Sequence, residues 1–234
     1  MDDDVKLVNF YSTVNIIALS HGCAVGWLSP FLPYLKSADT HLITGPVTSD
    51  EVSWIGSLLP VGGFIGTVTF GTISEKLGKK KSLFLLVFPH MIFWCLIFFS
   101  TQVYHLYIAR LLAGITGGGT LRTVSLYIAE ISENKIRGFL GSFLMFALCI
   151  GVLLIFTIGT YVRFFVVPAM MIVLPSIFLI SLIFLHDSPT SLLNLNKPEE
   201  ALKSLKFYRT CGNEKSAIEK VDEEFELLKR SLEL

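Results

Sequence analysis

The chain has 234 residues, of which 52% are hydrophobic and only 16% are charged. Soluble domains carry charge on about 25% of their residues, and a soluble core of this size has no room for 19 phenylalanines, so the composition predicts a protein that folds in a lipid bilayer. The formal net charge is zero, which argues against a nucleic-acid partner.

The N-terminus and the cysteines restrict the possible functions further. The chain begins Met-Asp-Asp-Asp-Val-Lys and lacks the basic start of a cleaved signal peptide, so residues 1–9 are predicted to form a short tail. The cysteines show no paired spacing, and three of them lie in apolar stretches where a free thiol packs as a small hydrophobe. They are Cys23, Cys95, Cys149 and Cys211. We therefore expect no disulfide, no metal site and no cofactor.

Six apolar stretches are long enough to cross a bilayer, which requires about 20 residues in a helix. In chain order they cover about residues 10–34, 52–73, 82–101, 104–127, 139–160 and 164–186. The predicted fold class is an all-α membrane protein whose bundle of six transmembrane helices occupies residues 10–186.

Beyond the last apolar stretch, residues 187–234 are charged and polar. Pro198 is placed as at a helix start, with Glu199 and Glu200 in the first turn. Apolar residues recur further on at the three- and four-residue spacing of an amphipathic helix; they are Ile218, Val221, Phe225 and Leu228. This segment is predicted to form short amphipathic helices outside the membrane.

The placement of lysine and arginine predicts the orientation in the membrane. Fifteen of the 19 lie in the segments that share one side of a six-span bundle, and only Lys36 and Arg163 lie on the other side. Because basic residues accumulate on the cytoplasmic side, both termini of the chain are predicted to be cytoplasmic.

Glycines cluster in the first and fourth stretches. The first contains Gly22-Cys-Ala-Val-Gly26-Trp27 followed by Pro30, and the fourth contains four glycines in the segment Gly114-Ile-Thr-Gly117-Gly118-Gly119. If the bundle consists of two inverted three-helix repeats, these positions correspond, and interrupted helices at matching positions mark the substrate region of secondary transporters. The alternative for each glycine is close helix packing.

A dense group of charges separates the second and third stretches. In "GTISEKLGKKK", residues 71–81, one acid and four lysines fall within seven residues, with one glycine before them and one among them. The glycines, Gly71 and Gly78, are predicted to shape a tight turn. The lysines have a purely topological interpretation, as anchors to the inner leaflet.

The same residues resemble the loop signature of the major facilitator superfamily, Gly-x-x-x-Asp-Arg-x-Gly-Arg-Lys/Arg. Four further segments match the family in order: "SWIGSLLPVGGFIG", "YIARLLAGITGGG", "YIAEISENKIRG" and "DSPTSLL". Together they resemble the sugar porter branch, and most closely the insect facilitated trehalose or glucose transporters. The resemblance implies a protein of two six-helix bundles, of which this chain matches the N-terminal bundle and the start of the cytoplasmic linker. Either the missing C-terminal bundle or a second copy is the expected partner.

The resemblance also implies an inner gate that holds the two bundles together on the cytoplasmic side. Its members would be Glu75, Lys76, Gly78, Lys79, Lys80, Glu130 and Arg137. Glu75 can cap the following helix or pair with a cation. The alternative is that these are solvated charges, whose pairs contribute about 0–1 kcal/mol. The family's loop arginines are lysines here, which lack the bidentate fork of arginine, so a looser gate is expected.

One sugar-contacting side chain of the family is replaced in this chain. Where glucose facilitators place a sugar-binding glutamine, this chain has Met145, whose thioether is a weak acceptor and no donor. Leu148 and Val152, one turn apart, and the interrupted region at Gly26 and Trp27 complete the candidate substrate-lining set.

Charges within membrane spans are functional candidates. Arg110 matches the family's Ala-Arg pair and alternatively snorkels to the interface, whereas Arg122 has no counterpart and is expected to face the interior or the missing bundle. His21 and His90 can titrate or simply pack.

Proton-coupled sugar porters carry a carboxylate in the first span, and Ala24 occupies that position here. The resemblance therefore favours facilitated diffusion of a hexose or trehalose through the plasma membrane, with the lipid bilayer and a small sugar as partners. The alternative is a sugar-porter-like membrane protein that does not transport, such as a sensor, a regulator or a decayed half transporter. No catalytic constellation is present, so an enzyme is not expected.

Overall fold

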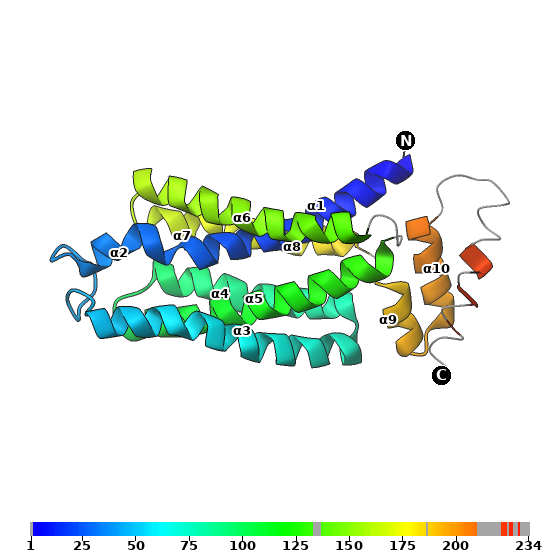
Figure 1. The fold of residues 1–234 in the computed structure, drawn as a ribbon, viewed down its shortest axis with the longest axis horizontal. Coiled ribbons are helices and arrows are strands. Elements are labelled where there is room, and N and C mark those ends of the chain that lie inside the picture. Colours follow the sequence, from blue (N-terminus) through cyan, green and yellow to red (C-terminus); the bar gives the residue numbers. More distant parts are fainter. Residues whose placement is uncertain are drawn as a thin grey trace.

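The computed structural model describes residues 2–132, 137–185, 187–209, 221–223, 225, 226 and 229. Its helices are α1 (Asp2–Gly26), α2 (Leu28–Lys36), α3 (Ser49–Leu77), α4 (Lys79–Phe98), α5 (Val103–Ile131), α6 (Arg137–Tyr161), α7 (Val166–Met171), α8 (Val173–Ser181), the 3₁₀ helix η1 (Leu182–Phe184), α9 (Pro189–Asn194) and α10 (Pro198–Arg209). No strand occurs in these residues, so the all-α prediction is confirmed. The long helices run side by side, and α9 and α10 lie across one end of the bundle (Figure 1).

Among the described residues, four segments are long and apolar enough to cross a membrane: Thr13–Lys36, Ser49–Leu77, Lys79–Phe98 and Arg137–Tyr161. The fourth predicted span corresponds to α5, which has the same length as α3 but is more polar. The sixth corresponds to Val166–Ser181, which is shorter than the others. The membrane character of the chain is therefore supported by its helices, and the count of six spans stays a prediction.

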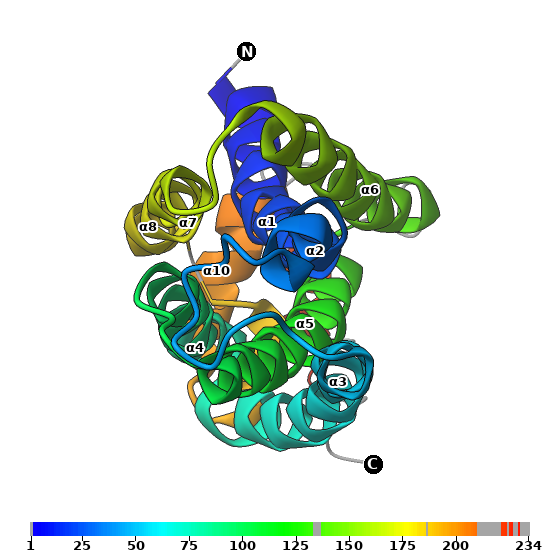
Figure 2. The same cartoon turned by 90° about the vertical axis from the view of Figure 1, so that its left-hand side faces the viewer.

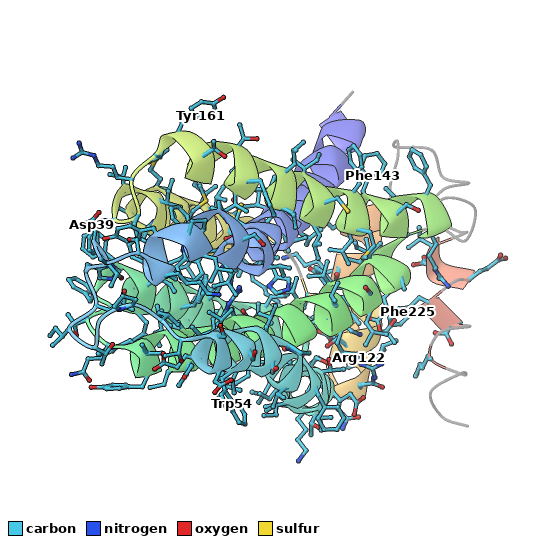
Figure 3. All side chains as sticks on the ribbon, turned by 60° about the vertical axis from the view of Figure 1, so that its left-hand side comes forward. Asp39, Trp54, Arg122, Phe143, Tyr161 and Phe225 are labelled. Carbon is cyan, nitrogen blue, oxygen red and sulfur yellow. The ribbon has the colours of Figure 1, made fainter. Side chains whose placement is uncertain are left out.

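Large apolar side chains cover the outside of the bundle. Trp54, Phe143 and Tyr161 are all exposed, and Figure 3 shows them projecting away from the helices. A water-soluble protein rarely exposes such continuous apolar surface. The exposed side chains are therefore suited to lipid or to a partner bundle.

The first span is interrupted at a single residue, Trp27, which keeps helical angles of φ −52° and ψ −40°. α1 ends at Gly26 and α2 begins at Leu28. The cause is local, because Pro30 has no N–H for the carbonyl of Gly26. The sixth span is interrupted in the same way, because α7 ends at Met171 and α8 begins at Val173. Pro175, four residues after Met171, has no N–H to donate to the Met171 carbonyl.

Two interpretations were open for the glycines of the fourth span, an interrupted helix or close helix packing, and the structure shows packing. α5 runs unbroken through Gly114 and Gly119. Gly114 instead lets α3 and α5 touch backbone to backbone: a Cβ atom on Gly114 would lie 2.1 Å from the carbonyl oxygen of Leu59, and one on Gly62 would lie 2.2 Å from that of Leu111. The packing alternative is correct for this pair of helices.

The same contact recurs between α1 and α6. A Cβ atom on Gly22 would lie 2.1 Å from the carbonyl oxygen of Leu148, and one on Gly151 would lie 2.1 Å from that of Leu19. In both helix pairs each glycine meets a leucine carbonyl three residues before the facing glycine. The first helix of one predicted repeat thus packs on the second helix of the other, in the same manner twice.

The helix pairs leave α1 and α5 at the centre of the bundle. Viewed along the long axis, α3 and α6 lie on one side, and α4 with α7 and α8 lie on the other (Figure 2). Two apolar clusters fill the bundle, one around Trp27 and Trp94 and one around Tyr127 and Phe178.

A third, smaller cluster lies outside the bundle. It contains Leu192, Ala201, Leu205, Val221 and Phe225. Val221 and Phe225 belong to the amphipathic pattern predicted for the tail, while Ile218 and Leu228 lie outside the described residues. The segment after residue 187 therefore has an apolar core of its own.

Candidate functional site at the charged end of the bundle

The turn between α3 and α4 depends on one glycine. Gly78 ends α3 and precedes α4 with φ of +93°, a conformation that side chains other than glycine rarely adopt. A Cβ atom there would lie 3.3 Å from Ser191 Oγ and 3.5 Å from Asp187 Oδ1. Gly71, predicted to shape the same turn, lies instead within α3 and faces Arg122. Gly78 therefore sets both the turn and the close approach of α9.

Lys79 begins α4 and forms the best shielded ion pair of this region. Its ammonium donates to Oε1 of Glu130 on α5, while the hydroxyl of Ser188 donates to Oε2 of the same carboxylate. The Lys79 and Glu130 side chains are only 9% and 21% exposed. A partly buried pair is screened less than a surface pair. One carboxylate thus joins α4, α5 and the N-cap residue of α9.

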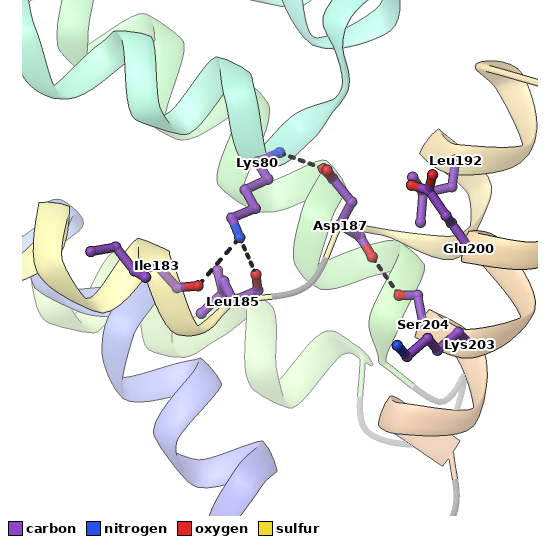
Figure 4. Close-up of a pocket in the computed structure, with 8 residues that line it drawn as sticks. All are labelled: Lys80, Ile183, Leu185, Asp187, Leu192, Glu200, Lys203 and Ser204. Carbon is purple, nitrogen blue, oxygen red and sulfur yellow. Dashed lines mark hydrogen bonds between the residues drawn. The ribbon is translucent and has the colours of Figure 1, made fainter. Parts of the chain in front are cut away.

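The acid that caps α4 is Asp187. Of the two roles open to Glu75, capping this helix or pairing with a cation, the structure shows the second, with Arg122. The N–H of Lys80 donates to Asp187 Oδ1 at 3.0 Å. The Asp187 carbonyl accepts from the Ser204 hydroxyl of α10. The Lys80 ammonium donates to the carbonyl of Leu185 at 2.5 Å and to that of Ile183 at 3.4 Å (Figure 4). Lys80 therefore holds the segment that leads from the bundle to α9.

Glu75 and Arg122 face each other further out. Their closest atoms are 3.9 Å apart and their side chains are 71% and 45% exposed, so the pair contributes little to stability. Figure 3 shows Arg122 pointing outward at this end of the molecule. Lys76 and Arg137 are exposed and form no ion pair with any residue that the structure describes.

Four of the seven predicted gate residues therefore lie together in the structure. Gly78, Lys79, Lys80 and Glu130 form one cluster with Asp187 and Ser188, which we call the charged end. Asp187 and Ser188 were missed as site residues, although the quoted segment "DSPTSLL" contains both. The remaining three, Glu75, Lys76 and Arg137, lie on the surface around this cluster.

Arg110 is buried in the bundle and does not snorkel. Its side chain is 3% exposed, and Nη1 donates to the carbonyls of Ala24 at 2.8 Å and Val25 at 3.5 Å. These carbonyls lie in the last turn of α1, next to the interruption at Trp27. The guanidinium also lies 5.6 Å from the ring of Trp27. Arg110 therefore stabilises the interruption of the first span.

His90 is a packing residue in this structure. Thr116 donates its own hydroxyl proton to the carbonyl of Ala113, so it accepts from His90 Nδ1 at 3.2 Å. The other ring nitrogen then accepts from Ser20 at 2.8 Å. The neutral ring is thus fully hydrogen-bonded. His21 packs directly on Gly117, where a Cβ atom would come within 2.1 Å of the imidazole.

The candidate substrate-lining residues divide into two groups. Met145 is 53% exposed on α6, and Leu148 and Val152 are half-buried on the same face beside α1. Gly26 is covered by the side chain of Ile155, and Trp27 is fully buried in the core. The first group is partly open at the surface of the bundle, whereas the second group is covered at the junction of α1 and α2.

The sequence profile of the "Sugar (and other) transporter" family matches residues 14–234. Among solved structures, the fold matches the major facilitator superfamily proton:xylose symporter XylE bound to 6-bromo-6-deoxy-D-glucose, with a TM-score of 0.85, 19% identity, and coverage of 99% of this chain and 54% of that chain. The protein is a helical membrane protein with half of a major facilitator fold. It belongs to the sugar (and other) transporter family.

Curated relatives agree with this assignment. The chain is 35% identical to Sugar transporter ERD6-like 6 of Arabidopsis thaliana over 163 residues, 70% of this chain and 34% of that protein. It is 30% identical to Solute carrier family 2, facilitated glucose transporter member 8 of Bos taurus over 192 residues, 81% of this chain and 39% of that protein. It is 29% identical to the Facilitated trehalose transporter Tret1 of Polypedilum vanderplanki over 196 residues, 82% of this chain and 39% of that protein.

The chain matches only a part of each of these relatives, between 34% and 39% of their length. The family assignment confirms the predicted resemblance to sugar porters. It also confirms that the protein belongs with transporters and not with enzymes.

Proposed function

We propose that the protein moves a small sugar, a hexose or trehalose, across the plasma membrane by facilitated diffusion, as the N-terminal six-helix half of an alternating-access carrier. The observation that carries the proposal is the family match over residues 14–234 together with the charged end. Sugar transport named for the relatives supports the substrate class.

In this proposal the six spans form two inverted three-helix repeats over residues 10–186, and residues 187–234 start a cytoplasmic linker. The two matched leucine–glycine contacts, α1 with α6 and α3 with α5, support the repeats. The clustering of basic residues at the charged end supports a cytoplasmic position for this end and for both termini.

The charged end is the proposed inner gate. Lys79, Glu130 and Ser188 tie the bundle to the linker, and the exposed charges of Lys76, Arg122 and Arg137 are left to meet a second bundle. Such contacts must form in one state and part in the other, which suits charges that water can solvate. The partner is a C-terminal bundle or a second copy of this chain.

Facilitated diffusion is favoured by the surroundings of Arg110. Its charge is met by the carbonyls of Ala24 and Val25, and no carboxylate pairs with it among the described residues. A proton coupled to transport needs a group that gains and loses it in the pathway, and Ala24 offers none. The solute is proposed to pass along Met145, Leu148 and Val152.

A second candidate function is a sugar-porter-like membrane protein that does not transport. Met145 at the expected glutamine position favours it, because a thioether cannot donate to a sugar hydroxyl.

Uptake of labelled glucose and trehalose into liposomes tests the proposal, with the chain alone and with the chain expressed together with the second bundle of its own gene, if one is encoded. Saturable flux that is lost in Glu130→Gln and kept in Glu226→Gln, an acid of the tail, supports an inner gate. Correctly folded protein without saturable flux in either arrangement favours the second candidate.

A further inference from the structure

Arg110 is a buried cation without a counter-charge. Its side chain is 3% exposed near the start of α5, and no carboxylate pairs with it among the described residues. The sequence offers none within the spans, because nearly all of the bundle lies in stretches without Asp or Glu, which are residues 5–38, 52–74, 76–129 and 134–186. A buried charge is costly unless it is paired. The carbonyls that Arg110 contacts are dipoles and leave its net charge in place.

The guanidinium of Arg110 also has a donor that is not used. Nη1 donates to the carbonyls of Ala24 and Val25, whereas Nε is buried and has no hydrogen-bond partner in the described part of the chain. Guanidinium nitrogens donate and do not accept. The group that satisfies Nε must therefore be an acceptor, and an acceptor with one negative charge would also compensate the cation.

Two more nitrogen atoms on the facing side of α1 lack partners. They are Nε1 of Trp27, whose ring lies 5.6 Å from the guanidinium carbon, and Nδ1 of His21. His21, Ala24 and Trp27 follow one another at three-residue spacing, so they share the side on which Ala24 meets Arg110. An indole nitrogen only donates, and an imidazole nitrogen can donate. Buried donors without an acceptor therefore surround one charged group between α1 and α5, the central helices of Figure 2.

We propose that a monovalent halide, chloride in physiological fluids, binds beside Arg110 and accepts hydrogen bonds from Nε of Arg110 and Nε1 of Trp27. One negative charge matches the one uncompensated guanidinium. A halide only accepts hydrogen bonds, so it brings no donor that would need a partner within the apolar cluster around Trp27. Water would satisfy the same donors and leave the charge uncompensated. The inference concerns the folded bundle and is independent of the transported solute.

The bound halide links two parts of the bundle. Arg110 belongs to α5, and Trp27 joins α1 to α2. An anion between them holds the junction of the first span against the centre of the bundle. The consequence is a bundle whose stability depends on the halide concentration, because a ligand that binds only the folded state stabilises it.

Unfolding of the purified 234-residue chain by urea, in micelles of a non-ionic detergent, tests the inference. Potassium chloride is compared with potassium methanesulfonate, a larger monovalent anion, at equal ionic strength. Urea is the denaturant because guanidinium chloride would supply the ligand. Each tenfold rise in chloride above its dissociation constant is expected to lower the equilibrium constant of unfolding about tenfold. Methanesulfonate is expected to have no such effect.

Ala24→Asp and Ala24→Asn are a matched pair of variants. They add side chains of the same size to the residue whose carbonyl meets Arg110, and only aspartate brings a carboxylate. Ala24→Asp is expected to lose the chloride dependence, because the built-in carboxylate takes the place of the halide. Ala24→Asn is expected to keep it. Arg163→Gln removes an exposed cation in the loop after α6 and is the control for diffuse attraction, with an unchanged dependence expected.

Identical unfolding curves in the two salts would overturn the site. A chloride dependence that persists in Ala24→Asp, or that disappears in Arg163→Gln, would place the effect elsewhere and overturn it as well. The comparison of salts on the unchanged chain decides the proposal even if both Ala24 variants fail to fold. Chloride-dependent stability in a chain without sugar flux would support this inference while the transport proposal fails.

Discussion

At the charged end the bundle is closed by a lysine, a carboxylate and a hydroxyl, whereas at the opposite end it is closed by rings packed around one histidine. His41, in the loop after α2, stacks on Tyr34 with centroids 5.7 Å apart and lies 4.5 Å from Phe164 and 4.7 Å from Phe165. Its Nε2 lies 3.0 Å from Ser100 Oγ, and we call this group the aromatic end.

The two ends differ in how easily their contacts can be replaced by contacts with other groups. Ring contacts are individually weak and add up over many atoms, so they hold one packing. An ion pair depends on two groups, and either one can be taken over by another charge or by water. We infer that the charged end is built to change partners and the aromatic end to stay closed, and four measurements test this contrast.

The largest effect is expected at the charged end. Lys79→Ala leaves the Glu130 carboxylate half-buried without its cation, which is expected to lower the free energy of unfolding by about 3–5 kcal/mol. Denaturant titration in micelles measures this change. Lys81→Ala, at an exposed position, is the control with an expected change within about 0.5 kcal/mol. Equal effects of the two substitutions would contradict the special position of Lys79.

At the aromatic end, Phe164→Ala is expected to cost about 3 kcal/mol. Phe164 is buried and contacts Trp27, Phe31 and Tyr34 as well as His41, so its removal leaves a cavity among rings. The control is Phe99→Ala, because Phe99 is 70% exposed. Thermal unfolding of both variants in the same detergent compares them. If the loss at Phe164 is no greater than at Phe99, the rings do not hold this end.

A smaller effect is expected for Gly78→Ala. Gly78 has φ of 93° and ψ of 159°, a region that is essentially restricted to glycine, so alanine there costs about 1–3 kcal/mol, and its Cβ would also press on Ser191. The free energy of unfolding measures the strain, and Gly56→Ala, where a Cβ meets open space, is the matched control. A stabilised Gly78→Ala variant would mean that this turn has another conformation.

The smallest effect is expected from pH at the aromatic end. Burial lowers the pKa of His41 below its ordinary value of 6.5, against the opposing effect of its bond with Ser100. A lowered folded-state pKa means that His41 contributes stability above pH 6.5, which is lost as pH falls through its folded-state value. The unfolding temperature should therefore fall more steeply on acidification in the native chain than in His41→Gln. Parallel curves would exclude His41 as the cause.

The sequence predicted the helical class, the positions of most apolar helices and the charged turn between α3 and α4. These follow from local properties, since apolar length and lysine clusters are visible along the chain. It left open whether Glu75 caps α4 or pairs with a cation, and in the structure Glu75 pairs with Arg122. The cap is Asp187, which lies 107 residues from its partner Lys80, and no local pattern encodes that meeting.

The glycine-rich spans show which features follow from local sequence and which depend on packing between helices. By itself the sequence determined that the first span breaks, because Pro30 lacks a donor wherever it sits. Only the tertiary structure decided that Gly114 packs instead of breaking α5, that Arg110 caps the end of α1, and that Trp27 is core. The physical reason is that each of these outcomes depends on a group from another helix, whose distance is set by packing and not by position in the chain.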